Sequence, residues 1–236
     1  MKGIFVTGTD TEVGKTFVSV LAAKWLRSRG VDVGVMKPVE TGCVEIDGRL
    51  VAPDAHALVA AAGVTDEMSL VAPCPLRKPL APLVASELEG RHVDTERIME
   101  AFRELASRHS FLVVEGIGGL LVPLTDKHLV MDMVERMGFP LLVVAANKLG
   151  AINHSLLTVE AARARGLSVS ALVLNLLTAH PDEAQQTNLM ALRDLLAEPV
   201  MEMPYGGGAE AADFLGKLLL GESDRSEDPS SAERHA

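Results

Sequence analysis

One segment near the start of the chain constrains the fold more than any other: a glycine-rich turn between a predicted strand and a predicted helix. The strand is the short apolar run Ile4–Val6, and the helix is expected over Thr16–Ser28, where apolar residues recur at helical spacing. Between them Gly8–Thr16 reads GTDTEVGKT. Glycines let such a turn fold tightly, so that backbone N–H groups and the helix N-terminus face a phosphate. The segment predicts a phosphate-binding loop, with Lys15 on the outer phosphates and the hydroxyl of Thr16 on Mg²⁺.

The spacing of this loop is one residue longer than the common P-loop pattern, because five residues separate Gly8 from Gly14. A glycine-capped turn that carries an incidental Lys-Thr pair is the alternative interpretation. The position of the loop, between a buried strand and an amphipathic helix, favours phosphate binding. We expect Lys15 to face solvent when no ligand is bound, because it lies at the start of the helix.

Short β-branched runs alternate with longer helical patterns along most of the chain, as is typical of a parallel sheet covered by helices. Further strands are expected at Val33–Lys37, Phe111–Glu115, Leu141–Ala146, Val169–Leu174 and Val200–Pro204, and further helices at Asp54–Ala62, Asp94–His109 and Asn153–Arg165. The proline-rich stretch Val71–Pro82 is expected to be an irregular loop. The predicted class is α/β: a P-loop NTPase-like three-layer fold with a mostly parallel central sheet flanked by helices.

A single domain is predicted over residues 1–220, followed at 221–236 by an acidic tail that is expected to be disordered. With 22 Lys and Arg against 32 Asp and Glu, the net charge of −10 argues against binding nucleic acid or an anionic membrane. No apolar run in the sequence is long enough to span a bilayer. Cys43 and Cys74 form no CxxC or Cys/His cluster, so a reducing, cytoplasmic location is expected.

Charged residues close two of the predicted strands at their carboxyl ends, where ligands bind in open α/β sheets. Glu115 follows four apolar residues, a position typical of Mg²⁺-binding acids, and the glycines of residues 116–119 allow close approach of a ligand. Lys37 ends another strand, so we expect its ammonium at the same edge. The alternatives are an acid that caps a loop and a solvated lysine. Asp54 is expected to be the N-cap of its helix.

A later segment, Asn147-Lys148-Leu149-Gly150, resembles the guanine-reading N-K-x-D sequence of GTPases but has glycine in place of the aspartate. The carboxylate that would pair with guanine is missing, so ATP is expected rather than GTP. The seven histidines are scattered without metal- or triad-type spacing, and His154 is interpreted as structural.

Together these segments resemble the dethiobiotin synthetase family. The resemblance rests on GTDTEVGKT, VMKPVETG around Lys37, Asp54, VVEGIGGLLVPL around Glu115, NKLGAINHSLLT and LNLL, and it spans about Phe5 to Pro204. The longer glycine loop is expected in this family. The resemblance implies an enzyme that uses ATP and Mg²⁺ to join CO₂ to 7,8-diaminopelargonic acid, closing a cyclic urea and releasing ADP and phosphate.

The same resemblance implies roles for individual residues. A carbamate on one amine would be activated by the γ-phosphoryl group as a mixed anhydride and attacked by the second amine, with Lys15 and Lys37 as catalytic cations. Thr16, Asp54 and Glu115 would hold Mg²⁺. The ATP-binding residues would be Glu12, Val13, Gly14, Lys15, Thr16, Phe17, Asp54, Glu115, Gly116, Ile117, Gly118, Asn175, Leu176, Pro204 and Tyr205, with Asn175 on the adenine. The substrate would contact Thr11, Lys37 and Thr41 and, across a homodimer interface, Gly150, Ala151, Ile152 and Asn153 of the neighbouring subunit.

Two other classes share parts of this pattern. A cobyrinic-acid-type amidotransferase has a similar phosphate loop but needs a glutaminase domain, which we do not expect in a chain of this length. A partitioning or switch ATPase usually has a second lysine early in the loop, where this chain has Thr9 and Asp10, and a surface for DNA or membrane. Both classes stay open as alternatives to the ligase.

Overall fold

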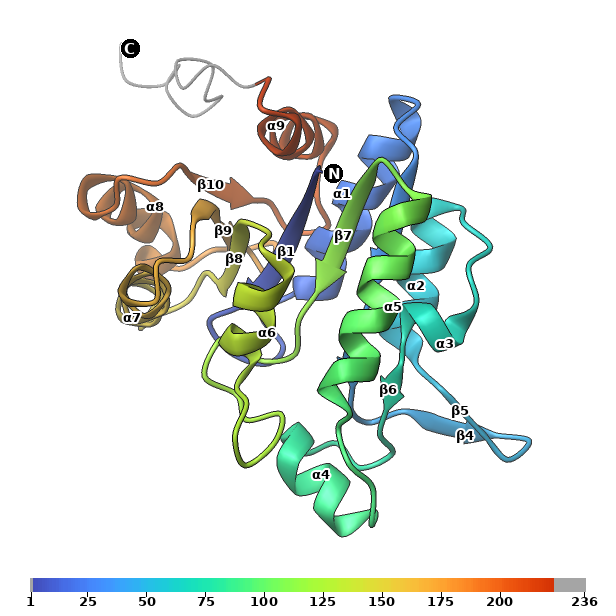
Figure 1. The fold of residues 1–236 in the computed structure, drawn as a ribbon. Coiled ribbons are helices and arrows are strands. Elements are labelled where there is room, and N and C mark those ends of the chain that lie inside the picture. Colours follow the sequence, from blue (N-terminus) through green and yellow to red (C-terminus); the bar gives the residue numbers. More distant parts are fainter. Residues whose placement is uncertain (1, 223–236) are drawn as a thin grey trace, which may run out of the picture.

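The computed structural model describes residues 2–222, and their main sheet has six parallel strands in the order β10-β9-β8-β1-β7-β2 (Figure 1). These strands are β1 (Lys2–Gly8), β2 (Val33–Met36), β7 (Phe111–Glu115), β8 (Leu141–Ala146), β9 (Val169–Asn175) and β10 (Val200–Met203). Two short pairings lie beside the sheet: β3 (Val39–Glu40) with β6 (Cys74–Pro75), and the hairpin of β4 (Val44–Ile46) and β5 (Arg49–Val51).

Helices cover both faces of the sheet, because successive strand side chains point to opposite faces and both faces are apolar. Ile4 and Val113 pack on one side, under α1 (Lys15–Ser28), α2 (Pro53–Ala62), α3 (Met68–Val71) and α9 (Ala209–Leu220). Phe5 and Leu112 pack on the other, under α5 (Thr95–Arg108), α6 (Val130–Met137), α7 (Ala151–Ala164) and α8 (Glu183–Leu195). This arrangement confirms the predicted three-layer α/β fold.

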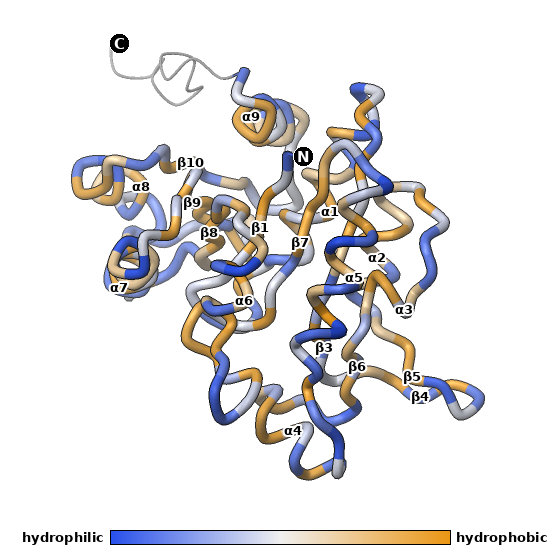
Figure 2. The backbone as a smooth tube through the Cα atoms, in the orientation of Figure 1, coloured by the Kyte–Doolittle hydropathy of each residue, from blue (hydrophilic) through white to orange (hydrophobic). Residues whose placement is uncertain are grey.

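The outer parts of the molecule differ in polarity from the sheet. Figure 2 shows that the residues of the central strands are mostly hydrophobic and that many residues of the connecting loops are hydrophilic. The helix α4 (Pro82–Leu88) lies on a lobe that projects from the rest of the molecule (Figure 1). Among the described residues, no helix combines the length and the apolar character needed to cross a membrane.

The predicted elements agree with the structure within a few residues; the helix expected from Asn153, for example, begins at Ala151. The proline-rich stretch expected to be irregular contains β6, and the helices α3, α4, α8 and α9 and the strands β3, β4 and β5 were not predicted. The prediction of a disordered tail at 221–236 falls almost wholly on residues outside the described part of the chain. Asp94 caps α5 as the sequence favours, its carboxylate accepting a hydrogen bond from the backbone N–H of Arg97 at 3.0 Å.

Asp54 is not an N-cap, and this prediction was wrong. Helix α2 is capped at Ala52, which places Asp54 in the first turn. The carboxylate of Glu40 accepts hydrogen bonds from the backbone N–H groups of Asp54 and Ala55, at 2.9 and 3.0 Å. A side chain distant in sequence therefore does the capping, and the side chain of Asp54 is left available for other contacts.

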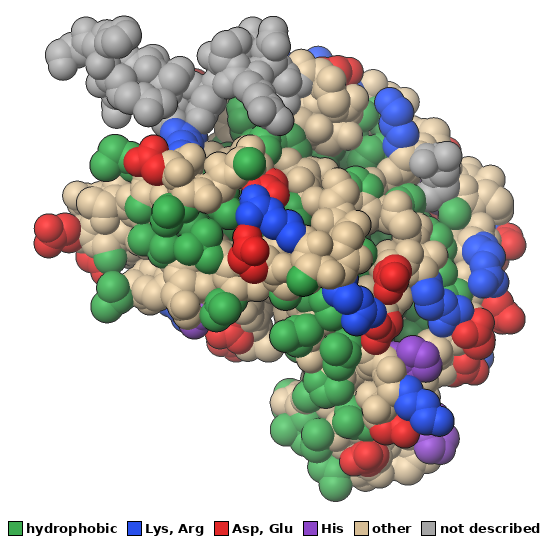
Figure 3. Space-filling model, turned by 60° about the vertical axis from the view of Figure 1, so that its left-hand side comes forward, with side chains coloured by type: hydrophobic (Ala, Val, Ile, Leu, Met, Phe, Trp, Pro, Cys, Tyr) green, Lys and Arg blue, Asp and Glu red, His purple; other side chains and the backbone are tan. Residues whose placement is uncertain are grey.

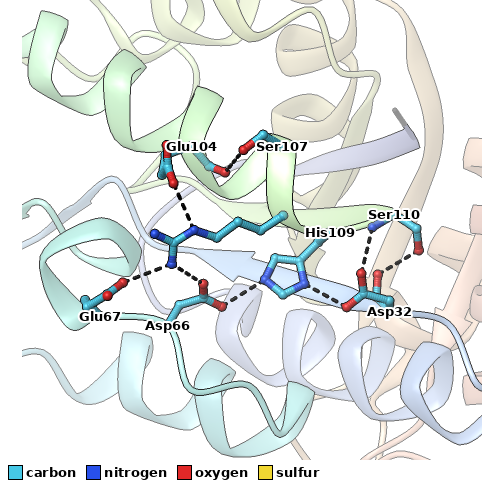
Figure 4. Close-up of polar contacts among 8 residues, drawn as sticks. Asp32, Asp66, Glu67, Glu104, Ser107, His109 and Ser110 are labelled. Atoms are coloured by element: carbon cyan, nitrogen blue, oxygen red, sulfur yellow. Dashed lines mark hydrogen bonds and ion pairs between the residues drawn. The ribbon is translucent and has the colours of Figure 1, made fainter.

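A polar network joins segments at the amino end of β2, away from the glycine loop (Figure 4). The ring of His109 bonds to Asp32 and Asp66, both at 2.8 Å, and Arg108 bonds to Asp66, Glu67 and Glu104. Burial alone would lower the pKa of His109, but the hydrogen bonds to its two carboxylates outweigh burial and raise the pKa above its ordinary value. The ring, bonded through both of its nitrogens, ties the start of β2 to the segment before α3.

We expect this network to make stability fall as the pH rises. A group whose pKa is higher in the folded state than in the unfolded state stabilises the folded protein. This contribution is complete when the pH is below the unfolded-state pKa of histidine, about 6.5, and it is lost as the pH rises through the folded-state pKa. His109→Asn is expected to lower the free energy of unfolding by about 1–3 kcal/mol at pH 6 and by less at pH 9. Urea unfolding across this pH range checks it, with the exposed His180→Asn as control. An equal loss at both pH values would contradict the assignment.

Candidate active site

The glycine loop wraps around the end of β1, and two of its residues have left-handed backbone conformations. Glu12 has φ of 56° and Gly14 has φ of 91°. A Cβ built on Gly14 would lie 2.0 Å from the side-chain nitrogen of Asn175, so glycine is required both for conformation and for space. The backbone N–H of Gly8 bonds to the carbonyl of Gly118 at 3.1 Å, which joins this loop to the turn after β7.

Lys15 is buried at the start of α1, which corrects the expectation that it faces solvent. It is 8 % exposed, and its Nζ donates to the carbonyl of Asp10 at 2.9 Å, so the loop folds over its own lysine. Burial and the nearby charge of Lys37 lower the pKa of Lys15 to about 8, against the opposing effect of the surrounding carboxylates. The ammonium is thus poorly solvated, and an arriving anion would interact with it strongly.

Lys37 lies between two carboxylates at the carboxyl edge of the sheet. Its Nζ is 2.5 Å from Oε1 of Glu115 and 2.9 Å from Oδ2 of Asp54, and it also donates to the carbonyl of Gly116 at 3.2 Å. Lys37 and Glu115 are 3 % and 0 % exposed. Burial alone would lower the pKa of Lys37, but Glu115 and Asp54 outweigh burial and raise it. The lysine is therefore held charged at the predicted edge.

The three residues expected to hold Mg²⁺ lie around this lysine. The hydroxyl of Thr16 donates to Oε1 of Glu115 at 2.8 Å. Asp54 is connected to Glu115 through Lys37, which forms an ion pair with each of the two carboxylates. The other carboxylate oxygen of Glu115, Oε2, is buried and has no hydrogen-bond partner among the residues that the structure describes. A hydroxyl and two carboxylates, one of which has an orphaned buried oxygen, form a donor set suited to a hard divalent cation. The residues present fit the magnesium ion that the family resemblance implies.

Glu40 is a site residue that the sequence analysis missed. It is buried, it caps the helix that carries Asp54, and burial raises the pKa of its carboxyl group. It lies on β3 outside the main sheet and belongs to no common motif. In the sequence, the one indication that Glu40 belongs to the site is its position within VMKPVETG, one residue before Thr41.

A cavity of 630 Å³ opens between the glycine loop, α2 and the segment before α4. Most of the predicted phosphate, metal and substrate residues line it: Thr11, Glu12, Gly14, Lys15, Thr16, Lys37, Thr41, Asp54, Glu115, Ile117 and Gly118. Residues 79–82, which the sequence analysis treated only as part of a loop, form another wall. Gly116 borders the cavity through its carbonyl bond to Lys37, and Val13 lies buried beneath the loop.

The residues expected on the adenine side lie at the ends of β9 and β10. Asn175 pairs with Met203 across these strands, and its side-chain amide donates to the carbonyl of Val13 at 3.0 Å. Leu176 bonds to Met203, Pro204 follows β10, and Tyr205 is 59 % exposed. A Cβ built on Gly207 would lie 3.1 Å from the ring of Phe17, so this segment is adjacent to α1. The structure thus brings Asn175 to the phosphate loop, outside the cavity itself.

The start of α7 does not line this cavity. Gly150 has φ of 92° and precedes the first turn, in which Ala151 is buried, Ile152 is half-buried and Asn153 is exposed. None of these four residues, within the described chain, contributes to the active-site cavity. The preceding Asn147 is fully engaged elsewhere: its side chain bonds to Gln185, Asn188 and Glu202. It therefore links the end of β8 to α8 and β10.

The geometry defines the class of protein. A parallel sheet, a glycine loop that closes over a lysine at a helix start, and an acid at the neighbouring strand end define a P-loop nucleotide-binding protein. Two solved structures share this fold. One is the MinC:MinD cell division protein complex of Aquifex aeolicus, with TM-score 0.53, 12 % identity and coverage of 92 % of this chain and 86 % of that chain. The other is the signal recognition particle receptor FtsY from Elizabethkingia anophelis, with TM-score 0.51 and 17 % identity; the match covers 94 % of this chain and 64 % of that chain.

Sequence comparison narrows the class to one family. A family model described as an AAA domain matches residues 2–201. The ATP-dependent dethiobiotin synthetase of Anaeromyxobacter sp. (strain K) is 41 % identical over 221 residues, covering 93 % of this chain and 97 % of that protein. The ATP-dependent dethiobiotin synthetase of Thermodesulfovibrio yellowstonii is 41 % identical over 212 residues, covering 86 % of this chain and 88 % of that protein. The chain belongs to the family of ATP-dependent dethiobiotin synthetases, which confirms the resemblance seen in the sequence.

Proposed function

We propose that this protein is a Mg²⁺- and ATP-dependent dethiobiotin synthetase that acts on 7,8-diaminopelargonic acid and CO₂. The observation that carries the proposal is the position of Lys37, held between Glu115 and Asp54 beside the phosphate loop. A partitioning or switch ATPase usually has its second lysine early in the phosphate loop. Here the second ammonium lies at the end of another strand, where it suits a reaction that builds an anion beyond those of the nucleotide.

The proposed reaction proceeds in three steps. One amine attacks CO₂ and loses a proton, which gives a carbamate. A carbamate oxygen attacks the γ-phosphorus, the bond from that phosphorus to the ADP oxygen breaks, and a carbamic-phosphoric anhydride forms. The second amine then attacks the carbonyl carbon and loses a proton, phosphate leaves, and the urea ring closes. The first step creates a new negative charge in the cavity, and the second moves negative charge between the carbamate and the phosphoryl groups without changing the total.

The residues of the chain counter that charge. Lys15 would donate to the transferring phosphoryl group once it exchanges its bond to Asp10 for a phosphate oxygen. Lys37 would turn from its carboxylates toward the carbamate, which it can neutralise because its raised pKa keeps it protonated. Thr16, Asp54 and Glu115 would hold Mg²⁺, which polarises phosphoryl oxygens when bound. Thr11 and Thr41 line the cavity and offer hydroxyls to the diamine or carbamate.

We further propose that the active protein is a homodimer with shared sites. The substrate carries a carboxylate, and the first-turn N–H groups of α7 form an anion site that the cavity of the same chain does not use. Leu149, just before that helix, and Leu157, in its second turn, are 84 % and 62 % exposed, which suits a contact with a second copy. Hydrophobic side chains also gather on the lobe that carries α4 (Figure 3), where Leu80, Val84 and Leu88 are exposed.

We place the protein in the cytoplasm and its catalytic domain at residues 1–220. The free thiols of Cys43 and Cys74 are buried, which fits a reducing compartment. The direct test of function is incubation with diaminopelargonic acid, bicarbonate and Mg·ATP, followed by mass analysis for the cyclic urea. Formation of ADP without the cyclic product would contradict the proposed substrate, and no ADP at all would contradict the ligase.

We expect Lys15→Ala to reduce turnover by about 10²–10³-fold, because one charged donor to the transferring phosphoryl group is lost. The fold should persist, since within residues 2–222 the ammonium of Lys15 bonds only to the carbonyl of an exposed residue. Coupled ADP release and thermal unfolding measure the two effects. The exposed Lys24→Ala, on the same helix, is the matched control. Near wild-type ADP release by the Lys15 variant would contradict its assigned role.

A further inference from the structure

A second cavity, of 460 Å³, lies outside the active site, between the β4–β5 hairpin, α2, α3 and the start of α5. No described residue lines both cavities. Its volume falls within the range of about 300–1,000 Å³ that is typical of small-molecule sites. The proposed reaction uses none of its side chains.

The floor of this cavity is apolar. Leu50, Met68, Ala72 and Pro73 contribute to it and are buried or half-buried. The buried thiol of Cys74 completes the floor, and burial raises its pKa to about 11, so it stays protonated and unreactive. The floor suits the apolar body of a ligand.

The rim of the cavity is cationic, although the chain as a whole has a net charge of −10. Arg91 and Arg97 line it, and neither has a carboxylate within ion-pair distance among residues 2–222. By contrast, Arg29, Arg108 and Arg163 all pair with acids. Arg91 donates to the carbonyl of Pro75 at 2.8 Å, which fixes its position at the rim.

The remaining polar groups do not neutralise these two guanidinium groups. Among the described residues, Asp94 is the one acid on the rim, and its carboxylate accepts from the backbone N–H of Arg97 as the cap of α5. His56 and His92 add two more nitrogen-bearing rings. Two guanidinium groups beside an apolar floor leave an unmatched positive charge at a concave site.

We propose that this cavity binds a small amphipathic anion, an organic acid with an apolar body. Arg91 and Arg97 hold the charged head, and the floor from Leu50 to Met68 takes the body. The site lies close to the active site without overlapping it. His56 follows Asp54 on the first turn of α2, and Pro75 pairs with Glu40 across β3 and β6. An occupant would contact the same segments that position those two acids.

The test uses the full-length protein and octanoate as probe, observed by the ring signals of His56 and His92 in proton NMR. His56→Gln and His92→Gln assign the two signals. Octanol and octylammonium share the chain without the negative head, octyl phosphate replaces the carboxylate by a phosphate, and inorganic phosphate has no body. We expect saturable shifts of both histidines with octanoate, octyl phosphate or both, and none with the other three.

The double variant Arg91→Gln/Arg97→Gln is expected to weaken this binding by about tenfold or more, since two charge-assisted hydrogen bonds are lost. Arg103→Gln, an exposed arginine of the same helix outside the cavity, should leave binding unchanged, and thermal unfolding verifies that all variants fold. Equal binding of octanol, binding of inorganic phosphate as tight as that of octanoate, or undiminished binding by the double variant would each overturn the proposal.

Discussion

Replacing Lys37 by alanine is expected to abolish measurable ligase activity and to destabilise the protein by about 3–5 kcal/mol, because it leaves the buried carboxylate of Glu115 without its countercharge. Glu115 is 0 % exposed, and its second carboxylate oxygen already lacks a hydrogen-bond partner. No other ammonium donates to it among the described residues. The loss of activity therefore follows from the missing ammonium of Lys37, and the loss of stability follows from the unpaired charge of Glu115. A second variant can distinguish these two causes.

Lys37→Ala/Glu115→Gln removes the unpaired charge as well. We expect this double variant to regain most of the lost stability, since an amide is less costly to bury than an unpaired carboxylate, while its activity stays absent. Urea unfolding and product formation measure the two quantities, with the exposed Lys127→Ala as control. If the double variant were no more stable than Lys37→Ala, or if Lys37→Ala kept normal turnover, the buried pair would not have the role assigned to it.

Mixing two inactive variants is expected to restore about one quarter of wild-type activity, provided that the sites are shared between subunits as proposed. One variant is Lys15→Ala, which disables the phosphate loop. The other is Asn153→Glu, which places an acid in the first turn of α7, where it favours the helix but repels a substrate carboxylate. Half of the mixed dimers would be heterodimers, and one of the two sites in each would have both parts intact.

The matched control mixes Lys15→Ala with Thr16→Ala. Both changes fall in the same loop, so no arrangement of the two chains rebuilds a complete site, and no activity should return. Subunits are re-equilibrated before the assay, and sedimentation reports the oligomeric state. Absence of recovery in the first mixture, or full activity of a sedimenting monomer, would show that each chain holds its substrate alone.

The sheet and its functional edge could be predicted because they depend on short-range patterns. Buried β-branched runs mark the strands, and parallel strands bring their carboxyl ends to one edge, so Lys37 and Glu115 were expected together from their positions alone. The phosphate loop was recognisable for the same reason. Its sequence, its strand and its helix are contiguous, and no distant contact is needed to define it.

The features that sequence missed depend on distant contacts. Glu40 caps α2 from a strand fourteen positions before Asp54 in the chain, and no local rule pairs these residues. The burial of Lys15 follows from the loop folding back to Asp10, a conformation that requires left-handed residues at Glu12 and Gly14. Within the proline-rich stretch, β6 forms only because β3 is there to pair with it.

The pairing of Lys37 with Glu115 also separates folding from the supply of metal. A buried carboxylate that relied on a bound cation for neutralisation would make the folded state depend on the concentration of that cation. This chain provides its own counterion, so the folded sheet edge does not depend on a bound cation for charge balance. If the proposed reaction uses magnesium, scarcity of the ion would slow that reaction without reducing the amount of folded protein.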